Sequence, residues 1–358
     1  MKDHRIYGIQ QVGIGVRDVK EAWKWYIDMF GVDCRIFEDE TEARLMLPYT
    51  GGEPRSRHAV LTYNLQGGGG FEIWQYKGRE PLDRKEDIRI GDIGILACKV
   101  KVKDIEEAYR FYKSKNVTFV TKPAEAPDRE KTFFIRDPYK NLFQLVQSDS
   151  WLLDEKKVTG GSCGTIIGVS DIDKAMRMYS DILGYETVVY DKTGNFGDIT
   201  SLPGGDGIFR RVLLKRKEPV SGPFCKLFGE SYMELIASVG NRGKKIYEGR
   251  LWGDPGFIHL CFDIRGMDDL RQYCDEKGFP FTVDTMKSID GKSFDMGEAA
   301  GHFAYAEDPD GTLIEFVETH KVPILKKFGW YLSLMKRDPG KSLPMIVFRF
   351  LRFSKVKI

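Results

Sequence analysis

The hydrophobic and polar positions of this chain follow one pattern that returns along its length. Residues 10–32 read QQVGIGVRDVKEAWKWYIDMFGV, and residues 163–185 read CGTIIGVSDIDKAMRMYSDILGY. Each stretch has an alternating run that predicts a strand, a Val-x-Asp turn, and then an apolar spacing that predicts an amphipathic helix. Asp18 and Asp171 stand where an N-cap is expected, and Gly31 and Gly184 stand where a C-cap is expected.

The same pattern returns at residues 95–117, with Asp104 as the cap, and more loosely at residues 259–279. Further strand-like runs follow each helix and end in a closing strand. The four closing strands are GFEIWQY (70–76), NLFQLVQ (141–147), SYMELIA (231–237) and TLIEFVE (312–318). The chain is therefore predicted to hold four β-α-β-β-β units, and each must pair with another to bury its exposed sheet face.

We expect the four units at residues 1–90, 91–150, 160–245 and 250–320, followed by a basic C-terminal extension at residues 321–358. From Lys321 onward, ten lysines and arginines stand against one acid, Asp338. The extension therefore carries a formal charge of +9. Because the net charge of the whole chain is +2, residues 1–320 carry −7. We expect the extension to pack on the body or on a second subunit rather than on a membrane surface or nucleic acid, because no basic nucleic-acid motif accompanies it.

This arrangement resembles the vicinal oxygen chelate superfamily, which includes glyoxalase I, methylmalonyl-CoA epimerase, extradiol dioxygenases, and fosfomycin and bleomycin resistance proteins. The resemblance rests on the repeated pattern and on the stretch DPDGTLIE (308–315), and it covers residues 8 to about 318. It implies an α+β fold in which four βαβββ units pair into two open, curved mixed β-sheet barrels with helices outside. The fold hosts several chemistries and does not fix the reaction.

In that family the metal ligands lie on the first and the closing strand of each unit, where alternate side chains point into a common cavity. The resemblance places four residues at the first-strand positions: Gln11, Ala97, Gly164 and His259. It places four others at the closing-strand positions: Glu72, Gln144, Glu234 and Glu315. Units one and four keep the best ligands, unit three keeps only a glutamate, and unit two keeps none that would bind well.

Two pairings of the units predict two different sites. If the outer units pair, Gln11, Glu72, His259 and Glu315 come together, which are the ligand types of glyoxalase I. Units two and three then form a ligand-poor second cavity. If sequence neighbours pair, Glu234 joins His259 and Glu315 in a set similar to the iron site of extradiol enzymes, although it lacks their first histidine. The division of ligands among the units favours the outer pairing.

The resemblance implies a divalent ion (Zn, Ni, Co or Mn) that chelates neighbouring oxygens of a small-molecule substrate and stabilises an enediolate. Glu315 is then the candidate base, and Glu72 is its counterpart across the metal. This is glyoxalase-like isomerase, epimerase or lyase chemistry. Two alternatives stay open. One is an extradiol-type, ring-cleaving dioxygenase that uses Fe, with His302 or Tyr305 as acid–base residue; the other is a non-catalytic small-molecule binding or resistance protein.

Composition narrows the location of the protein. Hydrophobic residues make up 42% and charged residues 30% of the chain, and no apolar run approaches the roughly 20 residues of a membrane span. The N-terminus lacks the apolar core of a signal peptide, and the six cysteines form no Cys-x-x-Cys pair. We expect a cytoplasmic monomer or homodimer with free thiols. His4, His58 and His320 carry no motif and are expected at the surface.

Overall fold

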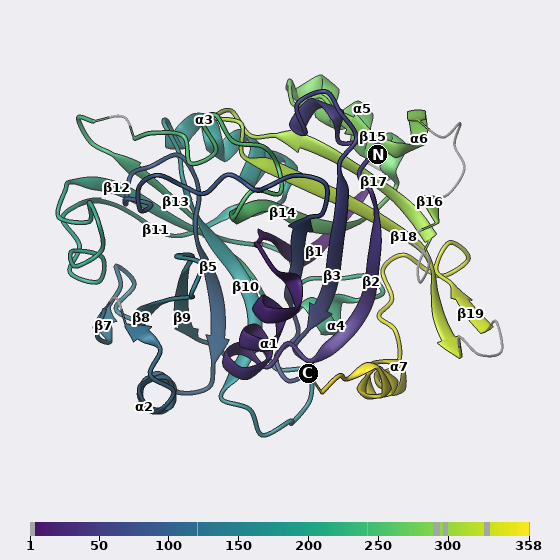
Figure 1. Ribbon diagram of the computed structural model, residues 1–358, viewed down its shortest axis with the longest axis horizontal. Helices are drawn as coiled ribbons and strands as arrows, with labels where there is room; N and C mark the ends of the chain where they lie inside the picture. Colours follow the sequence, from purple (N-terminus) through teal and green to yellow (C-terminus); the bar gives the residue numbers. More distant parts are fainter. Residues whose placement is uncertain are drawn as a thin grey trace.

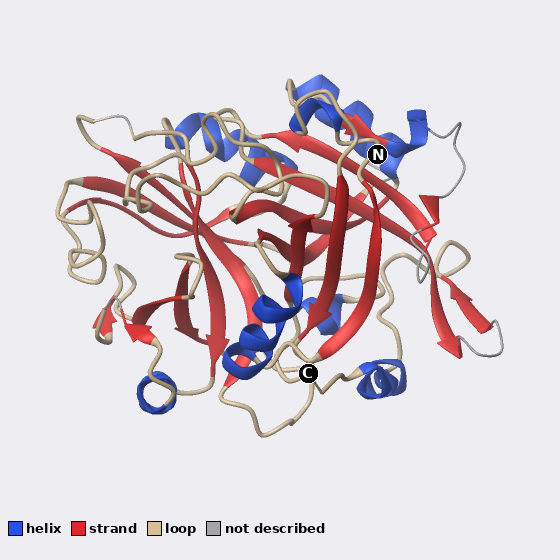
Figure 2. Ribbon diagram, in the orientation of Figure 1, coloured by secondary structure: helices blue, strands red, loops and turns tan. Residues whose placement is uncertain are grey.

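The computed structural model describes residues 4–119, 121–241, 243–288, 294–295, 300–325 and 330–357. Two curved mixed sheets, with helices packed on them, divide the molecule into two halves (Figures 1 and 2). The predicted α+β fold of paired units is confirmed. No helix in these described ranges is long and apolar enough to cross a membrane.

The first half is built on a sheet that joins both ends of the chain. Its strands are β1 (Arg5–Gly15), β2 (Cys34–Glu42), β3 (Ser56–Tyr63), β4 (Gly70–Tyr76), β14 (Gly256–Arg265), β15 (Val283–Asp284), β16 (Phe294–Asp295), β17 (Ala300–Glu307), β18 (Leu313–Leu325) and β19 (Trp330–Ser333). The main path across the sheet is β15-β17-β18-β14-β1-β4-β3-β2. Strands from the first and last predicted units therefore lie in one sheet.

The second half is built from the middle of the chain. Its strands are β5 (Gly94–Val102), β6 (Thr118–Phe119), β7 (Ala124–Glu125), β8 (Lys131–Arg136), β9 (Leu142–Gln147), β10 (Thr159–Gly168), β11 (Thr187–Gly194), β12 (Phe209–Lys215) and β13 (Tyr232–Ser238). The main path is β11-β12-β13-β10-β5-β9-β8-β6. The helices of the two halves are α1 (Val19–Phe30), α2 (Ile105–Ser114), α3 (Ile172–Met176), α4 (Cys225–Phe228), α5 (Met267–Lys277), α6 (Thr285–Ser288) and α7 (Met345–Phe350).

The order of the strands decides between the two pairings. β1 pairs antiparallel with β14, and β5 pairs antiparallel with β10, so outer units share one sheet and inner units share the other. Pairing of sequence neighbours is wrong, because β13, which carries Glu234, lies in a different sheet from β14 and β18. The alternative site of Glu234, His259 and Glu315 therefore does not assemble.

Local signals in the sequence set the helix ends. The side chains of Asp18, Asp104 and Asp171 accept hydrogen bonds from backbone N–H groups three residues ahead, as N-caps do. Gly31 ends α1 in the left-handed region, at φ 63°, where a residue without Cβ is favoured. The predicted N-caps of the first three units and the predicted C-cap Gly31 are confirmed, whereas the helical turn after α3 ends with Leu183 as its C-cap, one residue before the predicted Gly184.

One tyrosine from each half donates a hydrogen bond to an aspartate of the other half. α1 lies between the two sheets (Figure 1), and its Tyr26 donates a 2.7 Å hydrogen bond to Asp137 in the β8–β9 turn of the second half. Reciprocally, Tyr179, in the helical turn after α3, donates a 2.8 Å bond to Asp308 in the β17–β18 turn of the first half. All four side chains are buried. The apolar core around them is continuous across both halves.

Candidate metal centre

Three strands of the first half bring three acidic or imidazole groups together. Glu72 lies on β4, His259 on β14 and Glu315 on β18, and all three are buried. The His259 Nε2 atom lies 3.2 Å from Glu72 Oε2 and 3.1 Å from Glu315 Oε2. One ligand atom from each residue lies within 4.8 Å of the others, and this is the one such group in the described part of the chain.

Gln11 adds a fourth polar side chain from β1. Its Nε2 donates a 3.3 Å hydrogen bond to Glu315, whereas its Oε1 is buried without a hydrogen-bond partner. The ring nitrogens of His259 are likewise buried and make no hydrogen bond of normal geometry. Unpaired buried acceptors are costly, and two carboxylates, an imidazole and an amide oxygen suit a divalent cation. The residues present therefore fit the expected metal.

A glycine makes room for the imidazole. Gly13 on β1 lies directly across from His259 on β14. A Cβ at Gly13 would come within 2.4 Å of the His259 ring, so a side chain cannot be added there without moving the ring. Gly13 was not singled out from the sequence, because only the pairing of two strands distant in sequence shows why it must be small.

The two carboxylates control the protonation of the histidine. Burial alone would lower the pKa of His259, but Glu315 and Glu72 raise it to about 9. Burial would raise the pKa of Glu315, but His259 and hydrogen bonds from Tyr305 and Cys261 hold it below its usual value. This buried group of two carboxylates and one imidazole therefore attracts positive charge, either a proton on His259 or a metal cation.

Aromatic side chains enclose the group. The Trp252 indole stacks on the His259 ring at 6.2 Å between centroids, and Trp74 meets Trp252 edge-on at 4.6 Å. Tyr305 meets His259 edge-on at 5.7 Å. Trp252 belongs to the connector between β13 and β14. The hydroxyl of Tyr76 donates a hydrogen bond to the backbone oxygen of Trp252 and so fixes this connector. Trp252 lies at the start of the predicted fourth unit, before its first strand β14, and no pattern in the sequence indicated its role.

The equivalent place in the second half contains a buried network of ion pairs. Glu234 accepts from Lys99 at 2.6 Å, from the Arg211 Nε at 2.8 Å and from Tyr190 at 2.8 Å. Arg211 also binds Asp198 with two hydrogen bonds, and Lys99 donates to Gln144. In this network the two cations Lys99 and Arg211 balance the carboxylates of Glu234 and Asp198. In the first half, two carboxylates face only one imidazole. Ala97 and Gly164 supply no ligand, as expected from their side chains.

Other histidines lie elsewhere than expected. His58 is buried on β3 with its Nε2 3.0 Å from Glu38, so the expectation of a surface residue is wrong. His302 is also buried, on β17, where it lies 3.4 Å from the Thr285 hydroxyl and is not one of the metal-binding group. Of the two acid–base candidates for a dioxygenase, only Tyr305 lies against the candidate ligands.

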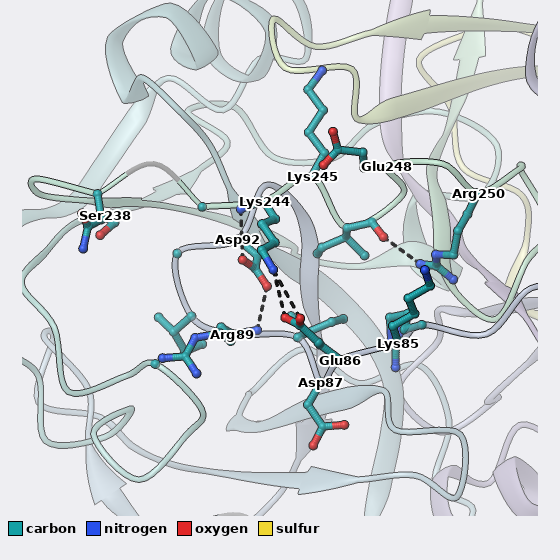
Figure 3. Close-up of a pocket in the computed structure, with 18 of the residues that line it drawn as sticks. Lys85, Glu86, Asp87, Arg89, Asp92, Ser238, Lys244, Lys245, Glu248 and Arg250 are labelled. Atoms are coloured by element: carbon teal, nitrogen blue, oxygen red, sulfur yellow. Dashed lines mark hydrogen bonds and ion pairs between the residues drawn. The ribbon is translucent and has the colours of Figure 1, made fainter.

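A separate crevice of about 900 Å³ lies between the two long connectors that cross from one half to the other (Figure 3). Lys244 and Glu86 pair across it at 3.1 Å, and Asp92 accepts from the backbone N–H groups of Arg89 and Lys244. None of the four candidate ligands lines it. Its central charges satisfy one another, so we assign no site to it.

Fold and site together define a class: paired βαβββ units with a buried group of metal-binding side chains at the centre of one sheet. Comparison with protein families agrees, since models described as Glyoxalase/Bleomycin resistance protein/Dioxygenase superfamily match residues 8–145 and 165–295. The chain belongs to this superfamily. The first match crosses from one half of the structure to the other, because sequence neighbours do not share a sheet.

Individual relatives are distant. The chain is 24% identical to a lactoylglutathione lyase of Schizosaccharomyces pombe over 50% of this chain and 55% of that protein, so it matches about half of that relative's length. It is 27% identical to a probable lactoylglutathione lyase of Synechocystis over 43% of this chain and 92% of that protein.

Two solved structures share the fold over most of the chain. Glyoxalase I of Zea mays is similar with a TM-score of 0.54 at 13% identity, over 88% of this chain and 94% of its own. A putative dioxygenase of Bacillus subtilis is similar with a TM-score of 0.55 at 14% identity, over 88% of this chain and 86% of its own.

Proposed function

We propose that this protein is a metal-dependent, glyoxalase-like enzyme that moves a proton on a small substrate whose neighbouring oxygens chelate the metal. One observation carries the proposal. Glu72, His259, Glu315 and Gln11 converge from four strands into a buried group. No lysine or arginine among the described residues neutralises this group, in contrast to Glu234 in the other half. A group of this kind suits a cation that also binds substrate.

In this proposal Gln11, Glu72, His259 and Glu315 hold a divalent ion of the Zn, Ni, Co or Mn type. When bound, such an ion is a Lewis acid that stabilises negative charge on two neighbouring substrate oxygens. A bound ion would take the place of the proton on His259, and the neutral imidazole and the amide would then contribute no charge. The two carboxylates alone would balance the ion's two positive charges.

The two carboxylates differ in their surroundings, and this suggests which one moves the proton. Glu315 receives hydrogen bonds from Gln11, Tyr305 and Cys261, which lower its basicity and fix its orientation. Glu72, on β4, faces His259, and fewer hydrogen bonds fix its carboxylate than fix that of Glu315. We therefore propose Glu72 as the base that accepts the proton and Glu315 as the partner that orients the site, the reverse of the roles that the family resemblance implied.

Two tryptophan side chains, Trp252 and Trp74, determine the polarity of the surroundings of the site. Trp252 and Trp74 surround the ligands with apolar surface, and the indole N–H groups of both are buried without a hydrogen-bond partner. These walls would exclude water from the charged intermediate. The two N–H groups are hydrogen-bond donors that no described residue uses. Because two relatives are named lactoylglutathione lyases, lactoylglutathione is the first compound to test.

Metal binding and proton transfer can be tested separately. The purified chain is loaded with each candidate metal, dialysed and analysed by elemental mass spectrometry. Proton transfer is followed by NMR, as deuterium uptake from solvent at the carbon beside the carbonyl of lactoylglutathione and of simpler hydroxycarbonyl compounds. We expect metal-dependent exchange that Glu72→Gln abolishes at matched metal content and that Glu315→Gln reduces less.

Other outcomes would redirect the proposal. Firmly bound iron with oxygen consumption on a catechol would favour the ring-cleaving alternative. Retained metal without any deuterium exchange would favour the non-catalytic binding protein. Failure to hold any of the metals would contradict the metal centre itself.

A further inference from the structure

The end of the chain is firmly attached to the first half through one of its faces. We call residues 341–357, which include α7, the C-terminal segment. Its Leu343 and Phe348 are buried in the core of the first half. The Val356 N–H donates a 2.9 Å hydrogen bond to the Asp33 backbone oxygen, and Arg352 pairs with Glu155 at 2.7 Å. Packing on the body, one of the two arrangements expected from the sequence, is confirmed.

The opposite face of the C-terminal segment presents large apolar side chains to solvent. Ile346 is 53% exposed, Phe350 is 50% exposed and Phe353 is 85% exposed. The rings of Phe350 and Phe353 stack with 6.0 Å between their centroids, so they form one continuous surface. Keeping such surface in water is unfavourable, and grouped apolar side chains of this kind mark interaction sites.

Basic side chains surround these apolar groups. Exposed cationic residues of the segment are Lys341, Arg349, Arg352 and Lys357. Lys341 and Arg352 also pair with Asp338 and Glu155, which lie outside the segment, so Arg349 and Lys357 are the main charges offered to a partner. The segment contains no aspartate or glutamate. α7 lies at the periphery of the molecule, beside the end of the chain (Figure 1), so a large flat partner can approach it. Apolar side chains at the centre of a basic rim match the chemistry of an anionic lipid surface.

The area of the patch argues against a second copy as its partner. A fully exposed phenylalanine offers about 150–250 Å². Three partly exposed side chains thus supply roughly 400 Å², about half of the 800 Å² that each partner of a stable interface buries. Peripheral membrane binding needs less area, because each lysine or arginine near an anionic surface contributes about 1 kcal/mol.

We propose that the exposed face of the C-terminal segment binds anionic phospholipid membranes, with Ile346, Phe350 and Phe353 entering the headgroup region and the basic residues contacting lipid phosphates and carboxylates. This differs from the expectation from sequence, which could not show that the aromatic residues face outward. The binding is peripheral and reversible, since six helical residues and one turn cannot span a bilayer.

The test uses the full chain and lipid vesicles. Co-sedimentation is measured with phosphatidylcholine vesicles that contain about 30% phosphatidylserine, and with phosphatidylcholine alone. We expect binding to the anionic vesicles only, and its loss at about 1 M salt, where the Debye length falls to about 3 Å. The double variant Phe350→Ser/Phe353→Ser should bind at least about tenfold more weakly.

Ile208→Ser is the matched control, because Ile208 is 55% exposed on the second half, far along the chain from the C-terminal segment. It should leave binding unchanged. Arg349→Gln/Lys357→Gln tests the charge separately and should also weaken binding. Absence of binding, equal binding to neutral vesicles, or unchanged binding by both double variants would overturn the proposal. A concentration-dependent dimer in light scattering that the aromatic variant abolishes would assign the face to a second copy instead.

Discussion

The ammonium group of Lys99 lies 2.6 Å from the carboxylate of Glu234, at the place in the second half where a metal ligand would stand. Lys99 lies on β5 and pairs with Gly164 on β10, just as Gly13 on β1 pairs with His259 on β14. Lys99 thus holds the position of Gly13, and Gly164 holds that of His259. A buried lysine therefore supplies positive charge in the second half. Together with Arg211, it leaves no net negative charge to attract a cation.

The first prediction concerns the number of metal ions. We expect about one divalent ion for each chain, because within the described ranges the carboxylates of the first-half site have no cationic side-chain partner other than His259, whereas Glu234 pairs with Lys99 and Arg211. Glu72→Ala should lose the ion, and Glu234→Ala should keep it. Elemental mass spectrometry on the dialysed proteins measures both. Two ions for each chain, or loss of metal in the Glu234 variant, would contradict this assignment.

The second prediction concerns stability against pH. Although burial opposes ionisation, Arg211 and Lys99 lower the pKa of Glu234 from 4.5 to about 2. A lowered folded-state pKa stabilises the protein above the unfolded value, and this stabilisation is lost as pH falls from about 4.5 through 2. It amounts to about 3 kcal/mol, at about 1.4 kcal/mol for each pKa unit. Urea unfolding between neutral pH and pH 3 should show about 2 kcal/mol of this loss, and Glu234→Gln should flatten the curve while lowering stability at neutral pH.

The third prediction concerns the contact between the halves. Tyr26→Phe and Tyr179→Phe should each lower the free energy of unfolding by about 1–3 kcal/mol, because each leaves a buried carboxylate without one donor. The two effects should add, since the bonds share no residue. Tyr139→Phe, in the same turn as Asp137 but half-buried, is the control and should change stability little. Unfolding curves by urea would measure all four proteins, including the double variant.

The repeating pattern made the four units, the N-caps of the first three helices and the outer pairing predictable from the sequence. These features depend on local periodicity and on which closing strands keep a glutamate. The surroundings of the site were not predictable in the same way. Gly13, Trp252 and Lys99 act across strand pairs or from a connector, so their roles depend on tertiary contacts that no local pattern encodes. For the same reason His58 and His302 gave no sign of their burial.

The fourth prediction concerns access to the centre. Trp252 covers the His259 ring, so Trp252→Ala should speed the loss of bound metal to a chelator and raise KM for an apolar substrate. The variant should also be less stable by about 3–5 kcal/mol, because a large buried ring leaves a cavity. Trp252→Phe keeps an aromatic ring and should show intermediate values. Trp25→Ala, on α1, is the control for a general effect of losing tryptophan; unchanged metal release in Trp252→Ala would contradict a covering role.

The last prediction concerns Gly13. Gly13→Ala places a methyl group within 2.4 Å of the His259 ring, so the ring must move away from Glu72 and Glu315. Disturbing a neighbour of a metal ligand typically weakens metal binding about 10–100-fold, and we expect that range here. Gly197→Ala is the matched control, because a Cβ at Gly197 meets nothing within 4 Å. Metal titration of both variants, with circular dichroism to establish folding, measures the effect. Equal affinities in a folded Gly13→Ala protein would show that His259 does not bind the metal in the position it holds between the two glutamates.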